Sequence, residues 1–511
     1  MTLYAAVLAL IVVTLLAVSL TRLGKVKTRA DYLVAGRSLP AFVLVFTLLS
    51  SWIGSGSLLG GAENAYRNGF AALWQGAGGW AGLALIYFIA PRARRFAQFT
   101  IPDLLEARYN QTARLLGVIA VLFAYTAITS YQMIGGGDIL HLILPDTVTP
   151  VGGRYLIAGF VVVFTAIAGM SSVAYMDVAI GLLATVTLCV ALPVVVHRFG
   201  GWSAVHAALP ATHFQPLGNL SFVQALELFL PTCLLMLGNQ SMYQKFFSAR
   251  SEKDASRAVV GWIVGTVLLE TVIVALAVAG SAVFPAGEVH EHPREILAYI
   301  GLHGFEPAQA VVTLYDNGLA TAVRTGQTPT PQIELYLLHL LGALLLGAIF
   351  AKIISTANNY LFSPATNLVN DIYVRYVRRE AGNREVLLVS RLMVAALGLW
   401  ALYQALHTES VLKKSLYAYT IYAAALTPVI LAAFYWRRAT AWAAVASIFT
   451  GTVVTVFWDS ALVHAHVPAR LAERDAILPA LAASVLCLIA VSLSSPRPTQ
   501  AQLRAVADSG G

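Results

Sequence analysis

Long apolar runs follow one another along the whole chain, separated by short polar stretches. Most runs have about 20 residues, the length that an α-helix needs to cross a hydrocarbon core of roughly 30 Å. The pattern predicts an all-α polytopic membrane protein with about thirteen transmembrane helices. The expected spans lie near 2–20, 40–61, 70–91, 113–143, 153–170, 175–197, 220–246, 257–284, 333–377, 386–407, 412–435, 439–458 and 476–495. The run at 113–143 is long enough to tilt, and the run at 333–377 extends beyond the bilayer or bends at Pro364.

Composition supports this class, because 58% of the 511 residues are hydrophobic, only 11% are charged, and the mean hydropathy is +0.73. We therefore expect a single transmembrane domain over 1–511, surrounded by the lipid bilayer. The stretch 2–19 lacks the basic leader of a signal peptide and precedes basic residues, which favours a retained first span. The net charge of +8 is spread over short loops, so it gives no indication of nucleic-acid binding.

The basic residues predict the orientation of the chain. Clusters such as Lys25 and Lys27 after the first span, Arg94 after the third and Arg378 after the ninth fall on one side. By the positive-inside rule, the N-terminus is outside and the C-terminus cytoplasmic. The loop from about 285 to 333 is then external.

Two spans are interrupted by residues that helices avoid. The second carries SSWIGSGSLLGG at 50–61, and the seventh carries Pro231 followed by LGNQSMYQ at 237–244. In transporters, such interruptions at corresponding places of two halves point to a binding site at the middle of the membrane. Glycines that only permit close helix packing are the alternative. The two breaks lie five spans apart, so each opens one half of a possible five-plus-five arrangement.

The ninth span is unusually polar, because 351–373 contains Lys352, a Ser-Thr pair and two asparagines. Polar groups are costly in hydrocarbon, so an ionisable residue there is a candidate functional residue.

These segments resemble the sodium:solute symporter family over nearly the whole chain. The similar motifs are DYLVAGRSLP (31–40), SSWIGSG (50–56), SSVAYMDV (171–178), YQKFFSAR (243–250), ISTANNYLF (354–362), NDIY (370–373) and FYWRRATAWAAVASIFTG (434–451). The resemblance implies a LeuT-like core of five-plus-five inverted repeats, 40–197 and 220–435, with an extra first helix at 2–20 and two C-terminal helices at 439–495. It also implies alternating access, with sodium as the driving ion. The SSWIGSG segment is similar to bacterial relatives of the choline transporters, and we expect a bacterial inner (plasma) membrane protein.

The resemblance also implies an ion site between the second and ninth spans. Its positions on this chain are Ser50, Ile53, Lys352, Ser355 and Thr356. Backbone carbonyls and two hydroxyls would supply the oxygen ligands of sodium, although Ser and Thr in a membrane helix also bond to their own backbone.

A small polar solute is expected beside that ion. The candidate residues offer hydrogen bonds and aromatic faces without a fixed charge, and they are Trp52, Ser55, Ser57, Gln75, Tyr131, Gln132, Asn239, Gln240, Tyr243 and Tyr422. Such a lining suits a neutral or zwitterionic metabolite, and Trp52 with the tyrosines is also able to stack on a quaternary ammonium.

Lys352 and Asn358 depart from the family pattern, in which a small residue and often an aspartate stand at these positions. The Lys352 ammonium either replaces sodium or pairs with Asp138 or Asp177 while its carbonyl still binds the ion. Replacement would make the protein a sodium-independent carrier, a proton-coupled carrier or an exchanger.

Other functions find little support in the sequence. The His290-Glu291-His292 pattern lacks the HExxH spacing of a zinc enzyme, and no P-loop indicates an ATP-driven pump, so we predict no enzymatic activity. The roughly fifteen residues after the last span leave no room for the signalling kinase of a sensor. A channel is a further, weaker alternative, and nothing in the sequence indicates an obligate protein partner.

Overall fold

The computed structural model of the chain describes residues 2–23, 28–96, 100–167, 169–285, 288–305, 332–408, 410–458, 460–472, 474–500 and 502–503. Regular structure in these residues is helical, apart from one isolated β-bridge between Leu39 and Ala249. The predicted all-α class is therefore confirmed. Lys25, Lys27 and most of the expected external loop at 285–333 lie outside the described residues.

The helices include short 3-10 and π segments, which are labelled η. In chain order they are α1 (Thr2–Leu23), α2 (Arg29–Val34), η1 (Ala35–Arg37), α3 (Ala41–Trp52), η2 (Gly56–Gly61), α4 (Ala62–Asn68), η3 (Gly69–Ala72), α5 (Leu73–Ile86), α6 (Ala90–Phe96), α7 (Ile101–Arg108), α8 (Gln111–Ile143), α9 (Pro150–Ile167), α10 (Met170–Phe199), α11 (Trp202–Ala208), η4 (Ala211–Phe214), α12 (Phe222–Gly238), α13 (Gln240–Ser248), α14 (Glu252–Val283), α15 (Glu288–Glu291), η5 (Pro293–Glu295), α16 (Ile296–His303), α18 (Gln332–Asn367), η6 (Leu368–Val377), α19 (Asn383–Leu406), α20 (Val411–Ile421), η7 (Tyr422–Leu426), α21 (Thr427–Tyr435), α22 (Ala441–Phe457), α23 (Ala461–His466), α24 (Ala469–Ala472) and α25 (Ile477–Ser494).

Each of the thirteen predicted runs coincides with one or more of these helices. By length and apolarity, nine helices of the described chain are able to cross a membrane, or ten if the bent pair Ala41–Trp52 and Gly56–Ile86 counts as one span. Two further apolar helices, Leu3–Val18 and Ala441–Phe457, are shorter. The bent pair contains the second and third predicted runs, and the two shorter helices correspond to the first run and the twelfth.

Both predicted helix breaks are confirmed. Helix α3 ends at Trp52, Ile53 is extended (φ −85°, ψ 100°), and the chain continues as the π-helix η2 after a bend of 57°. Helix α12 ends at Gly238, and Asn239 (φ −70°, ψ 112°) precedes α13. The Asn239 side chain accepts a hydrogen bond from the backbone N–H of Met242 at 3.3 Å, which caps α13. The second break bends the chain less than the first, because Phe222–Ser248 still forms one candidate membrane span.

The ninth run is one α-helix as far as Asn367, so the α-helical hydrogen-bonding pattern continues past Pro364. It then changes to the wider turns of η6, which extends to Val377.

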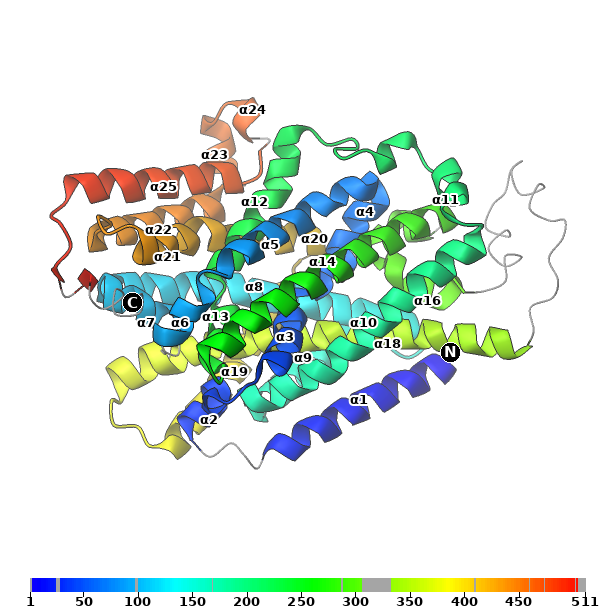
Figure 1. Cartoon of the computed structure of the whole chain (residues 1–511), viewed down its shortest axis with the longest axis horizontal. Coiled ribbons are helices and arrows are strands. Elements are labelled where there is room, and N and C mark those ends of the chain that lie inside the picture. The colour runs from blue at the N-terminus through cyan, green and yellow to red at the C-terminus, as the bar shows by residue number, and fades with distance from the viewer. Residues whose placement is uncertain are drawn as a thin grey trace.

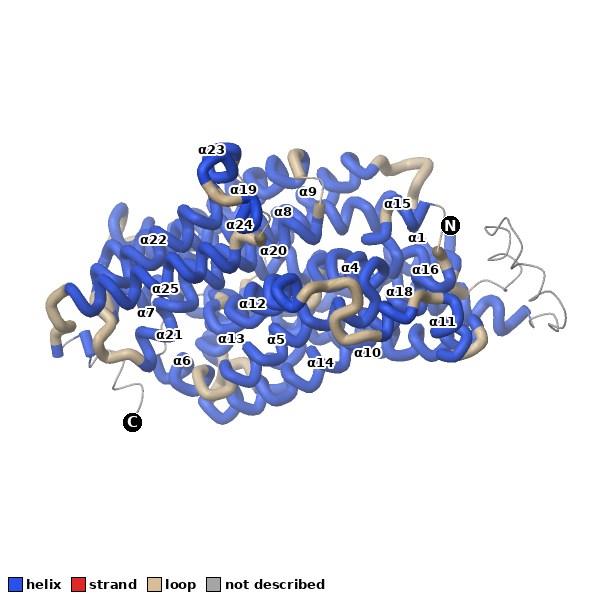
Figure 2. The backbone as a smooth tube through the Cα atoms, turned by 90° about the horizontal axis from the view of Figure 1, so that it is seen from above, coloured by secondary structure: helices blue, strands red, loops and turns tan. Residues whose placement is uncertain are grey.

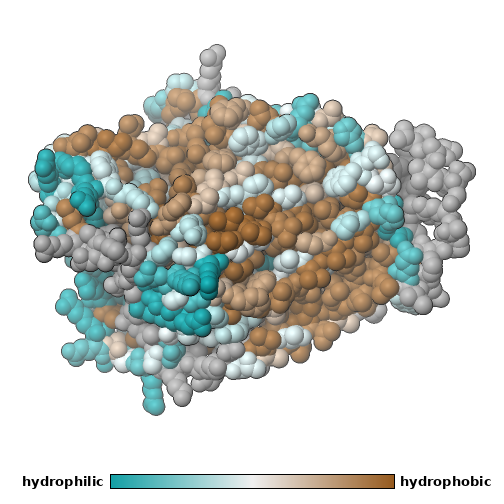
Figure 3. Space-filling view, viewed as in Figure 1, coloured by the Kyte–Doolittle hydropathy of each residue, from teal (hydrophilic) through white to brown (hydrophobic). Residues whose placement is uncertain are grey.

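The long helices α8 and α18 run nearly along the long axis of the molecule, α10 and α14 cross it obliquely, and the N- and C-terminal labels lie in opposite halves (Figure 1). Seen from above, the described chain is helical throughout its length, and loops are short (Figure 2). Hydrophobic residues cover the middle of the face in Figure 3, while hydrophilic residues gather at its left end and right edge. An apolar band between polar ends is the surface that a membrane-spanning protein presents to lipid.

Helix α18 packs against α8 and α10, and the broken α3 packs against α10, α14 and α18. These contacts bring the polar part of α18 to the break after α3.

Candidate ion and solute sites

The break after α3 directs backbone oxygens toward α18. The hydroxyl of Thr356 lies within hydrogen-bonding distance of three carbonyl oxygens, those of Ser50 (2.8 Å), Ile53 (3.2 Å) and Lys352 (2.9 Å). The Ser50 and Ile53 carbonyls are available because the chain leaves the α-helical path at Ile53. Four oxygens therefore meet at the predicted ion position.

Gly54 makes this close approach possible. A Cβ added there would lie 2.6 Å from Thr356 Oγ1, which is closer than side-chain atoms tolerate. The glycine in the interrupted segment thus has a specific role, because it lets the broken chain lie directly against α18.

Asp177 in α10 is the acceptor at the centre of an adjoining network and is fully buried. Its carboxylate accepts hydrogen bonds from Thr47 (2.5 Å), from Asn359 (3.2 Å) and from the hydroxyl of Ser355. Ser355, which the resemblance placed among the sodium ligands, therefore bonds to a carboxylate that lies beside the ion position.

Two lysines flank Asp177, and both are almost completely buried. Lys352 Nζ donates to Ser50 Oγ at 3.1 Å, and Lys245 Nζ donates to Asn359 Oδ1 at 2.9 Å. In the described part of the chain, neither lysine nitrogen lies within 4.0 Å of a carboxylate oxygen. Both lysines nevertheless interact electrostatically with Asp177. The alternative that Lys352 pairs with Asp138 is wrong.

Asp138 forms an ion pair with Arg294 at 3.1 Å instead. Asn358, the other departure from the family pattern, accepts a hydrogen bond from Thr165 Oγ1 at 2.9 Å. Lys352 therefore remains a buried cation beside the ion position, and its ammonium contacts a hydroxyl rather than the three carbonyls.

The donor set fits sodium in its chemistry, because hard cations prefer carbonyl, hydroxyl and carboxylate oxygens. The carbonyls of Ser50, Ile53 and Lys352 and the hydroxyls of Thr356 and Ser355 would hold such an ion. The nearby Lys352 ammonium opposes it electrostatically.

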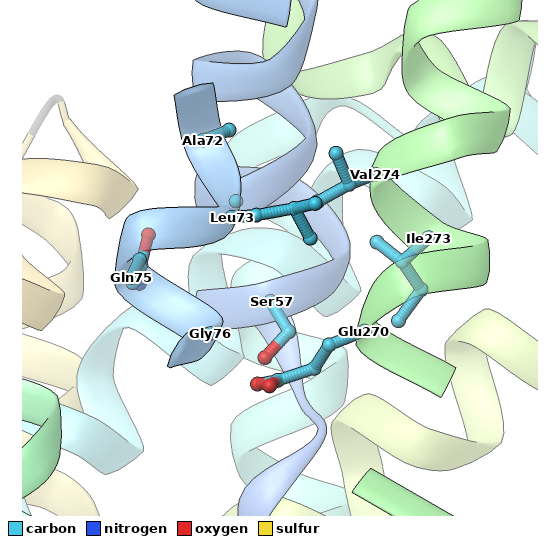
Figure 4. Close-up of a pocket in the computed structure, with 9 residues that line it drawn as sticks. Ser57, Ala72, Leu73, Gln75, Gly76, Glu270, Ile273 and Val274 are labelled. Carbon is cyan, nitrogen blue, oxygen red and sulfur yellow. The ribbon is translucent and has the colours of Figure 1, made fainter. Parts of the chain in front are cut away.

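A second polar site surrounds Glu270 in α14, which is 6% exposed. Trp52 Nε1 donates to one carboxylate oxygen at 2.6 Å, and Trp80 Nε1 donates to the other at 2.7 Å. The predicted solute residues Ser57 and Gln75 line the same small cavity (Figure 4).

Glu270 was not among the residues predicted from the sequence. The signal was present, since Glu270 is an acidic residue inside the apolar run at 257–284 and the argument applied to Lys352 holds for it as well.

Other predicted solute residues form a cluster of aromatic and amide groups. The Asn239 side chain accepts from Tyr125 OH at 2.6 Å and donates to Tyr360 OH at 2.9 Å, while Tyr422 stacks on Tyr125 with ring centroids 5.2 Å apart. Tyr125 and Tyr360 were not predicted. Tyr125 is an aromatic residue in a largely apolar run, which is usually packing, whereas Tyr360 directly follows the two asparagines of the polar ninth span and was recognisable from that position.

Contacts between side chains connect the Glu270 cavity to Tyr131. Trp52 stacks on Tyr419 with centroids 6.0 Å apart, and the hydroxyls of Tyr419 and Tyr131 lie 3.2 Å apart. The neighbouring Gln132 accepts a hydrogen bond from the backbone N–H of Ser55 at 2.8 Å. These contacts bring most of the predicted solute residues into one buried region around the first break.

Gln240 and Tyr243 are buried but face other partners. Gln240 accepts from the backbone N–H of Ile101 in α7 at 2.5 Å, and Tyr243 donates to the Leu237 carbonyl at 2.9 Å.

A helical membrane protein with two broken helices and buried oxygen ligands has the architecture of a secondary transporter, and similarity to known proteins identifies its family. The sequence profile of the Sodium:solute symporter family matches residues 32–451. The chain therefore belongs to the sodium:solute symporter family and is a transporter rather than an enzyme.

The relatives are similar over nearly their full length. The high-affinity proline transporter PutP of Bacillus subtilis is 26% identical over 496 residues, covering 92% of this chain and 94% of PutP. The osmoregulated proline transporter OpuE of the same organism is 24% identical and covers 93% and 91%. A sodium/proline symporter of Staphylococcus aureus is 24% identical and covers 92% and 88%.

Solved structures show the same fold. A Na⁺-coupled sialic acid symporter in a substrate-bound outward-open state matches with a TM-score of 0.73 at 17% identity, covering 98% of this chain and 99% of that one. The nucleobase-cation-symport-1 family transporter Mhp1 matches with a TM-score of 0.54 at 12% identity, covering 94% and 99%. The predicted LeuT-like fold is thus confirmed.

Proposed function

We propose that this protein moves a small polar solute across a bacterial plasma membrane by alternating access, with the ion position at the α3 break coupled to transport. The observation that carries the proposal is the convergence of three carbonyl oxygens on Thr356, where α3 is broken against α18. In the proposed orientation the N-terminus is outside and the C-terminus cytoplasmic.

The proposed solute region comprises the predicted residues around the first break together with Glu270. The relatives named as proline transporters make L-proline the first solute to test. A polar solute suits this region because its groups supply both hydrogen-bond donors and acceptors among aromatic faces.

Sodium-coupled symport follows from the family, and a specific observation favours a second candidate function. Two buried lysines, Lys352 and Lys245, flank a single buried carboxylate, Asp177. Sodium would add a further positive charge to a cluster with one carboxylate. At an effective dielectric constant of about 20, two like charges about 4 Å apart repel by about 4 kcal/mol. The second candidate is therefore a sodium-independent carrier in which the Lys352 ammonium takes the role of the ion.

Uptake of radiolabelled L-proline into proteoliposomes, with equal external sodium or potassium, separates the two candidates. Potassium is a better replacement than choline, because choline is itself a quaternary ammonium. Sodium symport predicts steep sodium dependence of wild-type uptake. Replacement of the ion by Lys352 instead predicts weak dependence in the wild type and a gain of sodium dependence in Lys352→Ala, because its carbonyl remains while the competing charge is removed. Lys352→Met, which keeps the length without the charge, should behave in the same way.

Steep sodium dependence of the wild type would contradict replacement of the ion and support sodium symport. If neither cation supports L-proline uptake, competition by a panel of polar metabolites in a binding assay identifies another solute for the same comparison.

A further inference from the structure

Glu270 is a buried acidic residue that takes no part in the candidate ion site. It lies in the middle of α14, and its two carboxylate oxygens are held by separate indole N–H groups from Trp52 in α3 and Trp80 in α5. Indoles only donate hydrogen bonds and carry no charge. The carboxyl group is therefore held in position by two helices through donors that carry no charge.

No cationic side chain of the described residues lies within ion-pairing distance of Glu270. An ionised carboxylate is costly to bury without a paired charge, and hydrogen bonds from neutral donors offset only part of that cost. Each carboxylate oxygen accepts one indole hydrogen bond and retains capacity for another. The site therefore lacks a positively charged donor.

The surroundings leave room for that donor on one side. The cavity beside the carboxylate is lined by Ser57 and Gln75, and in Figure 4 the hydroxyl oxygen of Ser57 and the carboxylate of Glu270 turn toward each other. Gly76 also borders it, and a Cβ there would lie 3.0 Å from Glu270 Oε2. The cavity measures about 20 Å³, about the space for one water molecule, so it suits a head group rather than a whole metabolite.

Gln75 also borders the cavity, but its side chain is not aimed at the carboxylate. It is 8% exposed, and its buried side-chain oxygen has no hydrogen-bond partner in the described structure. In Figure 4 this oxygen turns away from Glu270, so the polar groups that face each other across the cavity are Ser57 and Glu270.

We propose that Glu270 and Ser57 form a subsite for the protonated amine of the transported solute, with Trp52 and Trp80 fixing the carboxylate. The inference rests on the proposed transport function and specifies its substrate class: solutes with a primary or secondary ammonium group. Ammonium N–H groups would donate to the free acceptor positions of Glu270 and to the Ser57 hydroxyl.

The test uses purified protein in lipid nanodiscs and measures binding by tryptophan fluorescence and thermal shift. Methylammonium and pyrrolidine carry only the ammonium, L-proline carries ammonium and carboxylate, and cyclopentanecarboxylate carries only the carboxylate. Wild type should bind the three amines in preference to cyclopentanecarboxylate. Glu270→Gln, which keeps size and removes charge, should weaken binding of the amines by about tenfold or more, as loss of a buried charge pair does.

Two further variants make the result specific. Glu270→Asp keeps the charge, so the preference for amines should survive with weaker binding. Glu227→Gln is the matched control, because Glu227 is a buried glutamate of α12 that does not line the cavity. Its carboxylate accepts a hydrogen bond from the backbone N–H of Asp475. This variant should bind the four probes in the same order of affinity as the wild type.

Equal amine binding by wild type and Glu270→Gln would overturn the proposal and leave Glu270 as an anchor for the two tryptophans. The proposal would also be overturned if the wild-type protein bound none of the amines or preferred cyclopentanecarboxylate. This second outcome is measured on the wild type alone, so it does not depend on whether Glu270→Gln folds. Neither outcome affects the transport proposal, which is decided separately by the uptake of solute into proteoliposomes.

Discussion

Single residues at helix breaks and in buried polar clusters decide what this membrane protein is able to bind. Lys352, Asp177 and Glu270 are ionisable groups with at most 6% exposure, and each lies at a contact between helices. Charged groups in a membrane interior are costly, so their burial is a strong constraint on function. Lys352 and Asp177 belong to the ion position, whereas Glu270 is a separate carboxyl group with no cationic partner among the described side chains.

The first prediction at the residue scale concerns Gly54. Gly54→Ala would place a Cβ 2.6 Å from Thr356 Oγ1 and force the broken segment away from α18. We expect loss of uptake and a destabilisation of about 1–3 kcal/mol, as is typical of overpacking. Solute uptake and the melting temperature of the purified protein measure the two effects.

Gly159 in α9 is the matched control, because a Cβ there would meet no atom within 4 Å. Gly159→Ala should leave uptake unchanged and melt at the same temperature or slightly higher, since alanine favours helix. If Gly54→Ala were as active as Gly159→Ala, the close approach of the break to α18 would not be required for transport.

At the scale of helices, one ionic network joins α7, α8 and η6 near the end of the molecule where the chain terminates (Figure 1). Arg114 in α8 pairs with Asp103 at 2.6 Å, with Glu106 and with Asp371, which is fully buried. Burial raises the pKa of Glu106, which lies outside the candidate spans, but hydrogen bonds from Arg114 and Arg375 outweigh it and hold the pKa below its usual value. The network therefore favours the ionised form of Glu106, and its ion pairs hold the three helices together.

Arg114→Gln should destabilise the protein by about 3–5 kcal/mol, because it leaves the carboxylate of Asp371 buried without its cation. Arg375→Gln is the control: Arg375 pairs with Glu106 but is 52% exposed, so its loss should cost about 1 kcal/mol or less. Thermal unfolding of the two purified variants compares them. Similar melting temperatures would show that burial of Asp371 does not depend on Arg114.

At the scale of the whole molecule, the arrangement of helices fixes which loops share a side of the membrane. The proposed orientation places the loop after α8 outside and the loop after η6 in the cytoplasm. Asp146 and Glu380 are exposed residues of these two loops.

Single cysteines at these positions, in a variant without Cys189, Cys233 and Cys487, test the orientation. A membrane-impermeant maleimide should label Asp146→Cys in intact cells and Glu380→Cys only after the cells are permeabilised. The reverse pattern would invert the topology while leaving the fold unchanged.

The sequence by itself determined the class of fold, the helical runs and the two breaks. These features depend on local properties: apolar length fixes whether a helix can span the bilayer, and residues such as Gly54 and Asn239 interrupt the helix where they stand. The resemblance to the family also identified Ser50, Ile53 and Thr356, whose oxygens lie together in the structure.

Only the tertiary structure decided which polar groups meet. Glu270 lies 218 residues from Trp52 and 190 from Trp80, and no local pattern connects them. Likewise, the sequence left open whether Lys352 pairs with Asp138, and packing assigned Asp138 to Arg294. The physical reason is that the partner of a buried charge depends on how helices rotate and pack against one another, which no single apolar run specifies.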